Sequence, residues 1–195
     1  MKFKAAIAQA LADAIAADPK VLVCGQLVKY GQAGDITLGL PRTNLVEFPC
    51  AEALQNSAAV GLALAGHPTV MIHERWEFVM YAPDALLNYA PIWQRFVPLP
   101  LVIVAVVGKR GGQGPQQSKD FTHWFAHYEG WQLADPRDPQ QAYNWLRIAL
   151  TSQKPTMYVA RRELFELETG KDIAAPTSVG LCGAGKRFED AFYGD

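Results

Sequence analysis

The stretch LVIVAVVG, residues 101–108, carries no polar side chain. A short apolar run of this kind is typical of a strand in a parallel sheet that helices cover on both faces. The run VLVCG, residues 21–25, has the same character. Outward from these two runs, apolar stretches alternate with segments of helical periodicity. We therefore expect the α/β class: a three-layer, doubly wound, mostly parallel sheet with helices on both faces.

The order of the expected elements follows from this alternation. We expect strands at residues 21–25, 45–48, 69–73, 101–108, 131–134 and 156–160, and helices at 3–17, 51–65, 77–94, 119–128 and 138–152. In sheets of this class, ligands bind beyond the carboxyl ends of the strands. The segments expected to line a site are therefore 26–44, 49–52, 74–78, 109–119 and 135–137.

The bulk composition excludes several classes of protein. Half of the 195 residues are hydrophobic and 19% are charged, which suits one globular domain, expected at residues 1–170 with a tail at 171–195 and no second domain. The formal net charge of −1, without a block of like charge, argues against a nucleic-acid partner or an anionic membrane surface. No apolar run reaches the ~18 residues of a membrane span. The three cysteines are odd in number and widely spaced, so we expect no disulfide framework and a reducing, cytoplasmic location.

Two glycine-rich segments are candidates for ligand contacts. GLCGAGKR, residues 180–187, is similar to a P-loop, but Arg187 stands where a serine or threonine would bind magnesium, so we interpret it as part of the tail. GKRGGQGPQQSKD, residues 108–120, follows an expected strand and precedes an expected helix. Its glycines would let the backbone approach a ligand closely, and a plain surface loop is an equal alternative.

Histidine and cysteine side chains give weaker signals. His123 and His127 are four residues apart, but no acidic residue completes a metal site, so we expect a partly buried helix face and no metal. Cys50 precedes an expected helix and has no histidine near it in the sequence. We therefore expect a small buried residue at this position rather than a reactive thiolate.

The stretch VEFPCAEALQNSAAVGLALAG, residues 46–66, places a carboxylate at the start of an apolar helix. Glu52, Gln55 and Asn56 share one helix face, and residues 58–65, after Ser57, carry no polar side chain. A helix that is apolar all round is expected to be buried on every side. The residues alone leave two interpretations of Glu52 open. It is either a helix-start carboxylate favoured by the helix dipole, or a carboxylate held in an apolar wall that shares a proton with a ligand.

Four segments resemble a known family in collinear order over about residues 3–170. They are DPKVLVCGQLVKYGQAGDITLGL, VEFPCAEALQNSAAVGLALAGHPTVMIHERWEFVMYAPDALLN, GPQQSKDFTHWF and PTMYVARRELFE. Together they resemble the pyrimidine-binding domain of the transketolase-like family, and most closely the beta subunit of the 2-oxoacid dehydrogenase decarboxylase component. The resemblance implies thiamine diphosphate as the cofactor, which serves as an electron sink in decarboxylation.

The resemblance also implies roles for particular residues. Glu52 matches a glutamate that shares a proton with the aminopyrimidine ring and thereby activates the cofactor. Phe78 matches an aromatic side chain that packs on the pyrimidine, although ordinary core packing is an alternative. Gln26 and Gln117 stand where the family usually has a glutamate and a histidine. Because glutamine takes up no proton at neutral pH, these changes weaken a proton relay and remove an acid/base group, and we expect Gln117 to face the substrate.

The resemblance implies an enzyme subunit that works with a partner. The sequence lacks a GDG segment followed by asparagines, the pattern with which the family binds Mg²⁺ and the diphosphate in another domain or subunit. We therefore expect the pyrimidine-side subunit of a split enzyme for a 2-oxo acid or ketose-like substrate. The cofactor would lie at the interface with an alpha-like subunit that carries the Mg²⁺, self-association is expected, and this chain alone would bind the cofactor weakly.

Two other functions are open at this point. The first is a non-catalytic relative that serves as an assembly or binding module, which the departures at Gln26 and Gln117 favour. A buried carboxylate without a function is costly, so Glu52 argues against it. The second is an unrelated doubly wound nucleotide-binding protein, which the absence of a GxGxxG segment after the first strand disfavours.

Overall fold

Six parallel strands form one sheet in the computed structural model, which describes residues 1–108 and 114–168. The strands are β1 (Leu22–Gly25), β2 (Leu45–Glu47), β3 (Thr69–His73), β4 (Leu101–Val107), β5 (Gln132–Ala134) and β6 (Thr156–Arg161). Their order across the sheet is β2-β1-β3-β4-β6-β5, and every neighbouring pair is parallel. The predicted doubly wound α/β fold is confirmed, and this sheet is wholly parallel.

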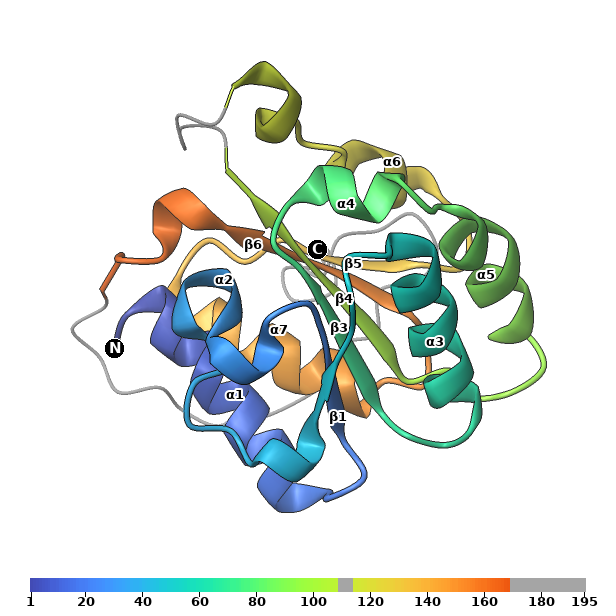
Figure 1. Ribbon diagram of the computed structural model, residues 1–195, viewed down its shortest axis with the longest axis horizontal. Helices are drawn as coiled ribbons and strands as arrows, with labels where there is room; N and C mark the ends of the chain where they lie inside the picture. The colour runs from blue at the N-terminus through green and yellow to red at the C-terminus, as the bar shows by residue number, and fades with distance from the viewer. Residues whose placement is uncertain (109–113, 169–195) are drawn as a thin grey trace, which may run out of the picture.

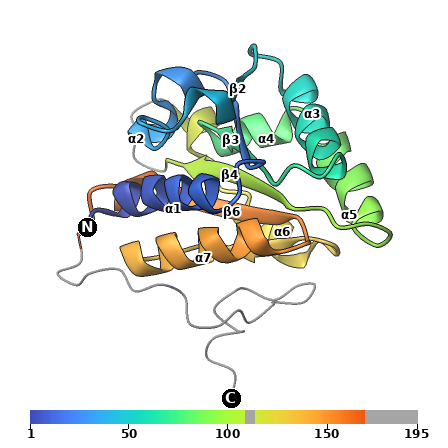
Figure 2. The ribbon, with the colours of Figure 1, turned by 90° about the horizontal axis from the view of Figure 1, so that it is seen from below.

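Helices cover both faces of the sheet, so the three expected layers are present (Figure 1, Figure 2). One face carries α1 (Phe3–Ala17) and α7 (Pro139–Thr151), which pack against each other. The other face carries α3 (Glu52–Leu64), α4 (Trp76–Met80), α5 (Ala90–Trp93) and α6 (Thr122–His127). The long connection from β1 to β2 contains the short helices η1 (Val28–Tyr30), α2 (Gln32–Asp35) and η2 (Arg42–Asn44).

Alternation of side chains along the strands produces two separate cores. Because successive side chains of a strand point to opposite faces, an apolar strand such as β4 contributes side chains to both cores. The core beneath α1 and α7 receives Val102, Val104 and Val106, and the core beneath α3 to α6 receives Leu101, Ile103, Ala105 and Val107. All of these side chains are fully buried. The continuous apolar character of this stretch is therefore a consequence of its central place in the sheet.

The predicted single helix at residues 77–94 is wrong. The chain instead forms α4, breaks at Ala82 and Pro83, and continues as a π-helical turn, η3 (Ala85–Tyr89), that runs into α5. Proline lacks the N–H that a helix needs and disfavours helical backbone in the residue before it. The carbonyl of Ala82, left outside the helix, accepts a hydrogen bond of 3.0 Å from Asn56 Nδ2.

The predicted helix at residues 119–128 is shorter in the structure. Residues Pro115–Ser118 form a 3₁₀ turn, η4, and Lys119 has extended backbone angles. The Asp120 side chain accepts a hydrogen bond of 3.0 Å from the backbone N–H of Thr122. An aspartate that satisfies a free backbone N–H in this way favours a helix start immediately after it, so α6 begins at Thr122.

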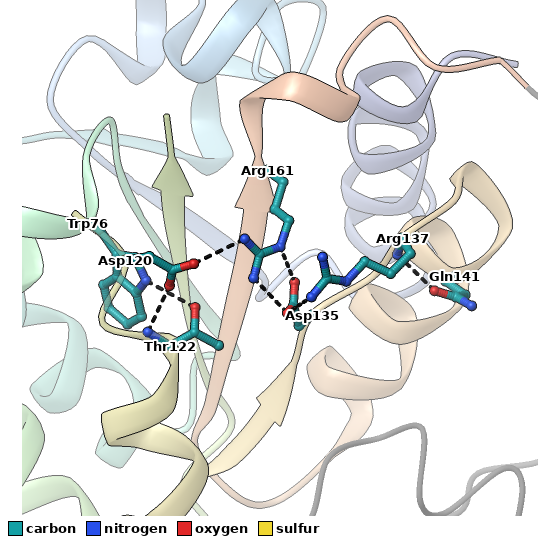
Figure 3. Close-up of polar contacts among 7 residues, drawn as sticks. All are labelled: Trp76, Asp120, Thr122, Asp135, Arg137, Gln141 and Arg161. Atoms are coloured by element: carbon teal, nitrogen blue, oxygen red, sulfur yellow. Dashed lines mark hydrogen bonds and ion pairs between the residues drawn. The ribbon is translucent and has the colours of Figure 1, made fainter. Parts of the chain in front are cut away.

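A buried ion-pair network joins the ends of β5 and β6 to the start of α6 (Figure 3). Arg161 donates from Nε and Nη2 to both carboxylate oxygens of Asp135, over 2.7 and 2.8 Å, and from Nη1 to Asp120 over 3.0 Å. Arg137 donates to the same Asp135 over 2.5 Å. Burial raises the pKa of Asp120, but the hydrogen bonds from Thr122 and Arg161 outweigh this effect and lower the pKa to about 2.

The segments outside the described residues include several sequence predictions. These are the domain boundary at residue 170, the tail at 171–195, the motif at 180–187 and most of the glycine-rich part of 108–120. The described chain ends beside its own beginning, where Lys2 forms an isolated bridge with Glu168 and ion pairs join Lys2 and Lys4 to Glu166.

Replacement of Arg161 by leucine tests the contribution of this network to stability. Loss of Arg161 removes a cationic partner of Asp120 and leaves Arg137 as the remaining arginine beside buried Asp135, so we expect the free energy of unfolding to fall by about 3 kcal/mol. Arg95→Leu is the matched control, because the Arg95–Glu129 pair is solvent-exposed and should change the same quantity by less than about 1 kcal/mol. Urea titration of the three proteins measures both changes, and equal losses in the two variants would contradict this role of the network.

Candidate active site

The four residues singled out from the sequence lie at the carboxyl end of the sheet. Gln26 directly follows β1, Glu52 opens the helix after β2, Phe78 lies in the helix after β3, and Gln117 lies in the turn after β4. All four side chains are half-buried. Helix α4 packs against both α3 and η4, so the element that carries Phe78 connects those that carry Glu52 and Gln117.

Helix α3 is buried on one face only, so the prediction that it is buried on every side is wrong. Gln55 and Asn56 are buried, with 3% and 0% of their surface exposed. The apolar side chains of Leu54 and Leu64 are exposed to 49% and 38%. The polar residues are buried because they form hydrogen bonds inside the protein, and the helix leaves an apolar face uncovered in the single chain.

Glu52 sits in the first turn of α3, where the helix dipole favours a negative charge. The Gln55 side chain donates to the carbonyl of Pro49 over 2.7 Å, which fixes the turn that leads into the helix. Cys50 is exposed, contrary to the buried position expected from the sequence, and its Sγ lies 3.9 Å from Glu52 Oε1. The carboxylate therefore stands at the entrance of the site, partly shielded by the protein and still reachable by a ligand.

A buried polar pair links α3 to the end of β3. His73, which is 2% exposed, lies with Nε2 2.8 Å from Asn56 Oδ1. Asn56 donates its own N–H to Ala82, so its oxygen is the acceptor and the hydrogen-bond network assigns the proton to His73 Nε2. Burial lowers the pKa of His73 from 6.5 to about 4. This neutral imidazole holds α3, one turn after Glu52, in place against the sheet.

The stability of the protein should decrease in mild acid because of His73. The unfolded chain protonates this histidine below about pH 6.5, whereas the folded protein keeps it neutral down to about pH 4. The free energy of unfolding should therefore fall by about 2 kcal/mol between pH 7 and pH 5 on this account alone. Urea titrations at several pH values should show a smaller fall for His73→Gln than for the wild type. Parallel pH profiles for the two proteins would contradict the assignment.

The loop after β1, which begins with Gln26, has strained backbone. Leu27, Ala33 and Asp35 have positive φ angles of 61°, 53° and 70°, which non-glycine residues rarely adopt. Two carboxylates from neighbouring strand ends stabilise these conformations. Glu47 accepts hydrogen bonds from the backbone N–H groups of Leu27 and Lys29, and Glu74 accepts one from Ala33. Strain of this kind is typical of ligand-binding segments.

The segment around Gln117 is attached to α4 by three hydrogen bonds. Buried Glu77 accepts from the backbone N–H of Lys119 over 2.7 Å, and Trp76 Nε1 donates to Thr122 Oγ1 over 3.2 Å. The Gln116 amide donates to the Tyr81 hydroxyl over 3.4 Å. The ring of Tyr81 also lies 5.8 Å from that of Phe78. The candidate aromatic contact and the candidate substrate-facing loop are therefore connected through α4 and Tyr81.

No metal site is found among residues 1–108 and 114–168, where no group of three His, Cys, Asp or Glu side chains is placed to hold an ion. His123 and His127 are both exposed, so the partly buried face predicted for them is wrong. They lie on α6. Residues 119–121 separate this helix from η4, the turn that contains Gln117.

Sequence reasoning missed several charged and polar side chains at this edge. His73 ends an apolar strand and gave no signal beyond its position. Glu77 lies beside Phe78 in a segment selected for inspection, and its charge within a helix next to a strand end could have singled it out. Arg161 is the last residue of β6 and Arg162 follows it, and the carboxyl end of this strand was not among the selected segments.

Comparison with known families identifies the kind of domain that this chain forms. Residues 1–166 match the family model described as "Transketolase, pyrimidine binding domain". The chain belongs to this family.

Curated relatives of this pyrimidine-domain chain are subunits of a larger assembly. The pyruvate dehydrogenase E1 component subunit beta, mitochondrial, of Caenorhabditis elegans is 28% identical over 174 residues, with 85% of this chain and 49% of the relative covered. The Drosophila melanogaster subunit of the same name is 29% identical over 168 residues, covering 82% and 46%. The chain thus spans about half the length of the curated relatives it matches.

A solved structure shares the fold. It is described as "Split gene transketolase, inactive beta4 tetramer", and it aligns with a TM-score of 0.66 at 16% identity over 80% of this chain and 50% of that one. In the part of this chain that the structure describes, no helix is long and apolar enough to cross a membrane.

Proposed function

We propose that this chain is the pyrimidine-side subunit of a split thiamine-diphosphate-dependent enzyme that acts on a 2-oxo acid or ketose-like substrate. The observation that carries the proposal is the place of Glu52. It is a half-buried carboxylate at the start of α3, at the carboxyl edge of a sheet whose family binds the pyrimidine. Similarity to pyruvate dehydrogenase E1 beta subunits supports the 2-oxo acid, and the split transketolase supports the ketose.

The residues at this edge fit the aminopyrimidine end of the cofactor. When bound, thiamine diphosphate supplies a carbon nucleophile and an electron sink. Glu52 would share a proton with a ring nitrogen of the bound pyrimidine, and Phe78 would offer an apolar surface for the ring. Gln117 donates or accepts hydrogen bonds toward the substrate, and Gln26 bonds without exchanging a proton.

The partner in this proposal is an alpha-like subunit that binds the diphosphate and Mg²⁺. It is supported by the sequence, which lacks the GDG and asparagine pattern with which the family binds the diphosphate and Mg²⁺. The exposed apolar face of α3, with Leu54 and Leu64, supports an interface there. Self-association is part of the same proposal, supported by the tetramer named for the structural neighbour. Its cytoplasmic location stays a prediction, since the names of the relatives place them in mitochondria.

The alternative function is an assembly or binding module without catalysis. Gln26 and Gln117 favour it, because neither side chain can replace the proton transfer of a glutamate or histidine. The two functions differ in one measurable respect: only the enzyme subunit needs the carboxylate of Glu52 for turnover.

Glu52→Gln should nearly abolish turnover of the assembled complex, because glutamine keeps the size of the side chain and loses the shared proton. Removal of a positioned acid or base typically lowers the rate by about 10²–10⁴-fold. The measurement is steady-state turnover of 2-oxo acids and ketoses by the complex, with assembly checked by size-exclusion chromatography. Glu163→Gln, at an exposed position in η5 (Arg162–Leu164), is the matched control and should retain activity.

Normal turnover in the assembled Glu52→Gln complex would contradict the assigned mechanism. Loss of assembly together with turnover would instead assign Glu52 to the interface, and the module function would then be favoured.

A further inference from the structure

A cavity lies at the amino edge of the sheet, opposite the edge that carries the candidate active site. Its volume is about 570 Å³, which is within the range of sites that bind small molecules. The segments that precede β1, β3 and β4 contribute Val21, Pro68 and Pro100 to its lining. The last turns of α1, α3 and α7 complete the walls, so helices from both faces of the sheet meet at this cavity.

Small side chains leave this space open, and apolar side chains border it. Ala14 of α1, Ala63 of α3 and Gly66 just after α3 line the cavity. Leu64 and Val97 add apolar surface, of which 38% and 39% stay exposed. Entry of an apolar group would remove this surface from water, which is favourable.

Hydrogen bonds between the surrounding loops hold the cavity in shape. The backbone N–H of Leu22 donates to the Pro68 carbonyl over 2.9 Å. The backbone N–H of Leu99 donates to the Gln153 carbonyl over 2.8 Å. Because the walls are fixed by contacts within the chain, a ligand would not have to order them when it binds.

Two cationic side chains without an acidic partner line the cavity. Arg147 of α7 is half-buried and Lys20 is exposed. Neither forms an ion pair with an acidic side chain among residues 1–108 and 114–168. Asp18, the carboxylate in the lining, accepts a hydrogen bond of 2.9 Å from the backbone N–H of Lys20. The lining therefore carries more positive than negative charge.

The helix ends do not account for these two cations. A cation in the last turn of a helix would stabilise the free carbonyls there, but neither cation lies in the last turn of α1, α3 or α7. Backbone groups serve as caps instead. Asp18 donates its N–H to the Ala14 carbonyl, and Ser152 donates its N–H to the Ile148 carbonyl. The charges of Lys20 and Arg147 are thus available to a ligand.

We propose that this cavity binds a small amphipathic anion, a molecule with one acidic group on an apolar body of several carbon atoms. Arg147 binds the acidic group, Lys20 adds positive charge at the opening, and the apolar body packs against Leu64 and Val97. A medium-chain carboxylate and an alkyl phosphate share this chemistry. The site lies at the other edge of the sheet from Glu52, so the inference does not depend on the proposed function.

Methyl nuclear magnetic resonance of the full-length chain tests the proposal. Leucine and valine methyl groups are labelled with ¹³C, and the signals of Leu64, Val97 and Leu87 are assigned by substitution. Octanoate, octyl phosphate, 1-octanol and acetate are titrated separately at constant ionic strength. We expect saturable shifts at Leu64 and Val97 with octanoate, octyl phosphate or both. 1-Octanol, which lacks the charge, should bind about tenfold more weakly, and acetate, which lacks the apolar body, should cause no saturable shift.

Substitutions separate the charge of the site from its shape. Arg147→Gln should weaken binding of the acidic probe about tenfold, and Arg147→Lys should retain part of it. Ala17→Phe, at an exposed position of the lining, should fill the cavity and abolish the shifts while both cations remain. Lys29→Gln is the matched control, because Lys29 lies in η1 at the carboxyl edge of the sheet, and it should leave the titrations unchanged.

Leu87 reports on a different surface, the apolar pocket that it forms with Trp124 and Tyr128. Shifts at Leu87 without saturable shifts at Leu64 and Val97 would overturn the proposal, because the amphiphiles would then bind only to exposed aromatic side chains. Equal affinity in Arg147→Gln, or equal affinity for 1-octanol and the acidic probes, would overturn it as well. Backbone amide spectra confirm that each variant is folded.

Discussion

Burial of the sheet on both faces is the constraint on which the rest of the structure depends. β4 contributes side chains to two cores at once, so it has no room for a polar group along its length. Polar chemistry is therefore confined to the two edges where the strands end. At the carboxyl edge, the chain leaves each strand with free backbone groups that must be satisfied. Charged side chains at the ends of the strands form hydrogen bonds at this edge.

Most of those charged side chains hold backbone or neighbouring charges, and few remain for a ligand. Glu47 and Glu74 support the strained loop after β1, and Glu77 anchors the segment that carries Gln117. The Arg161 network joins the ends of β5 and β6 (Figure 3). Against this background, the carboxylate of Glu52 is only half-buried, and it is the acidic side chain to which the proposed function assigns the contact with the cofactor.

The sequence predicted the fold class and the strands because both depend on local pattern. Continuous apolar runs are visible in any strand buried on two faces, and their alternation with helical segments implies a parallel sheet. The helix over residues 77–94 was predicted wrongly because its apolar periodicity outweighed Pro83, and the hydrogen bond from Asn56 that completes the break is not local. The burial of helix α3 was predicted wrongly for a different reason. Its polar residues are buried by partners from other elements, including His73, which no periodicity reveals.

For the site, the positions of Gln26, Glu52, Phe78 and Gln117 at one edge follow from strand order and the resemblance. Most of their supporting contacts could not be predicted, because they join residues far apart in the chain, from 17 positions for His73 and Asn56 to 46 for Trp76 and Thr122. The exposure of Cys50 was not predicted either. Cys50 lies in the turn before α3, and this turn depends on the hydrogen bond from the Gln55 side chain to the Pro49 carbonyl.

The most direct measurement is to tag the chain in its own host, purify it with whatever binds it, and identify the bound proteins by mass spectrometry. The purified material is then assayed for thiamine diphosphate and Mg²⁺. The account predicts a stoichiometric partner whose sequence carries the GDG and asparagine pattern, with the cofactor bound to the complex. A chain that assembles only with itself and takes up no cofactor even from excess would contradict it.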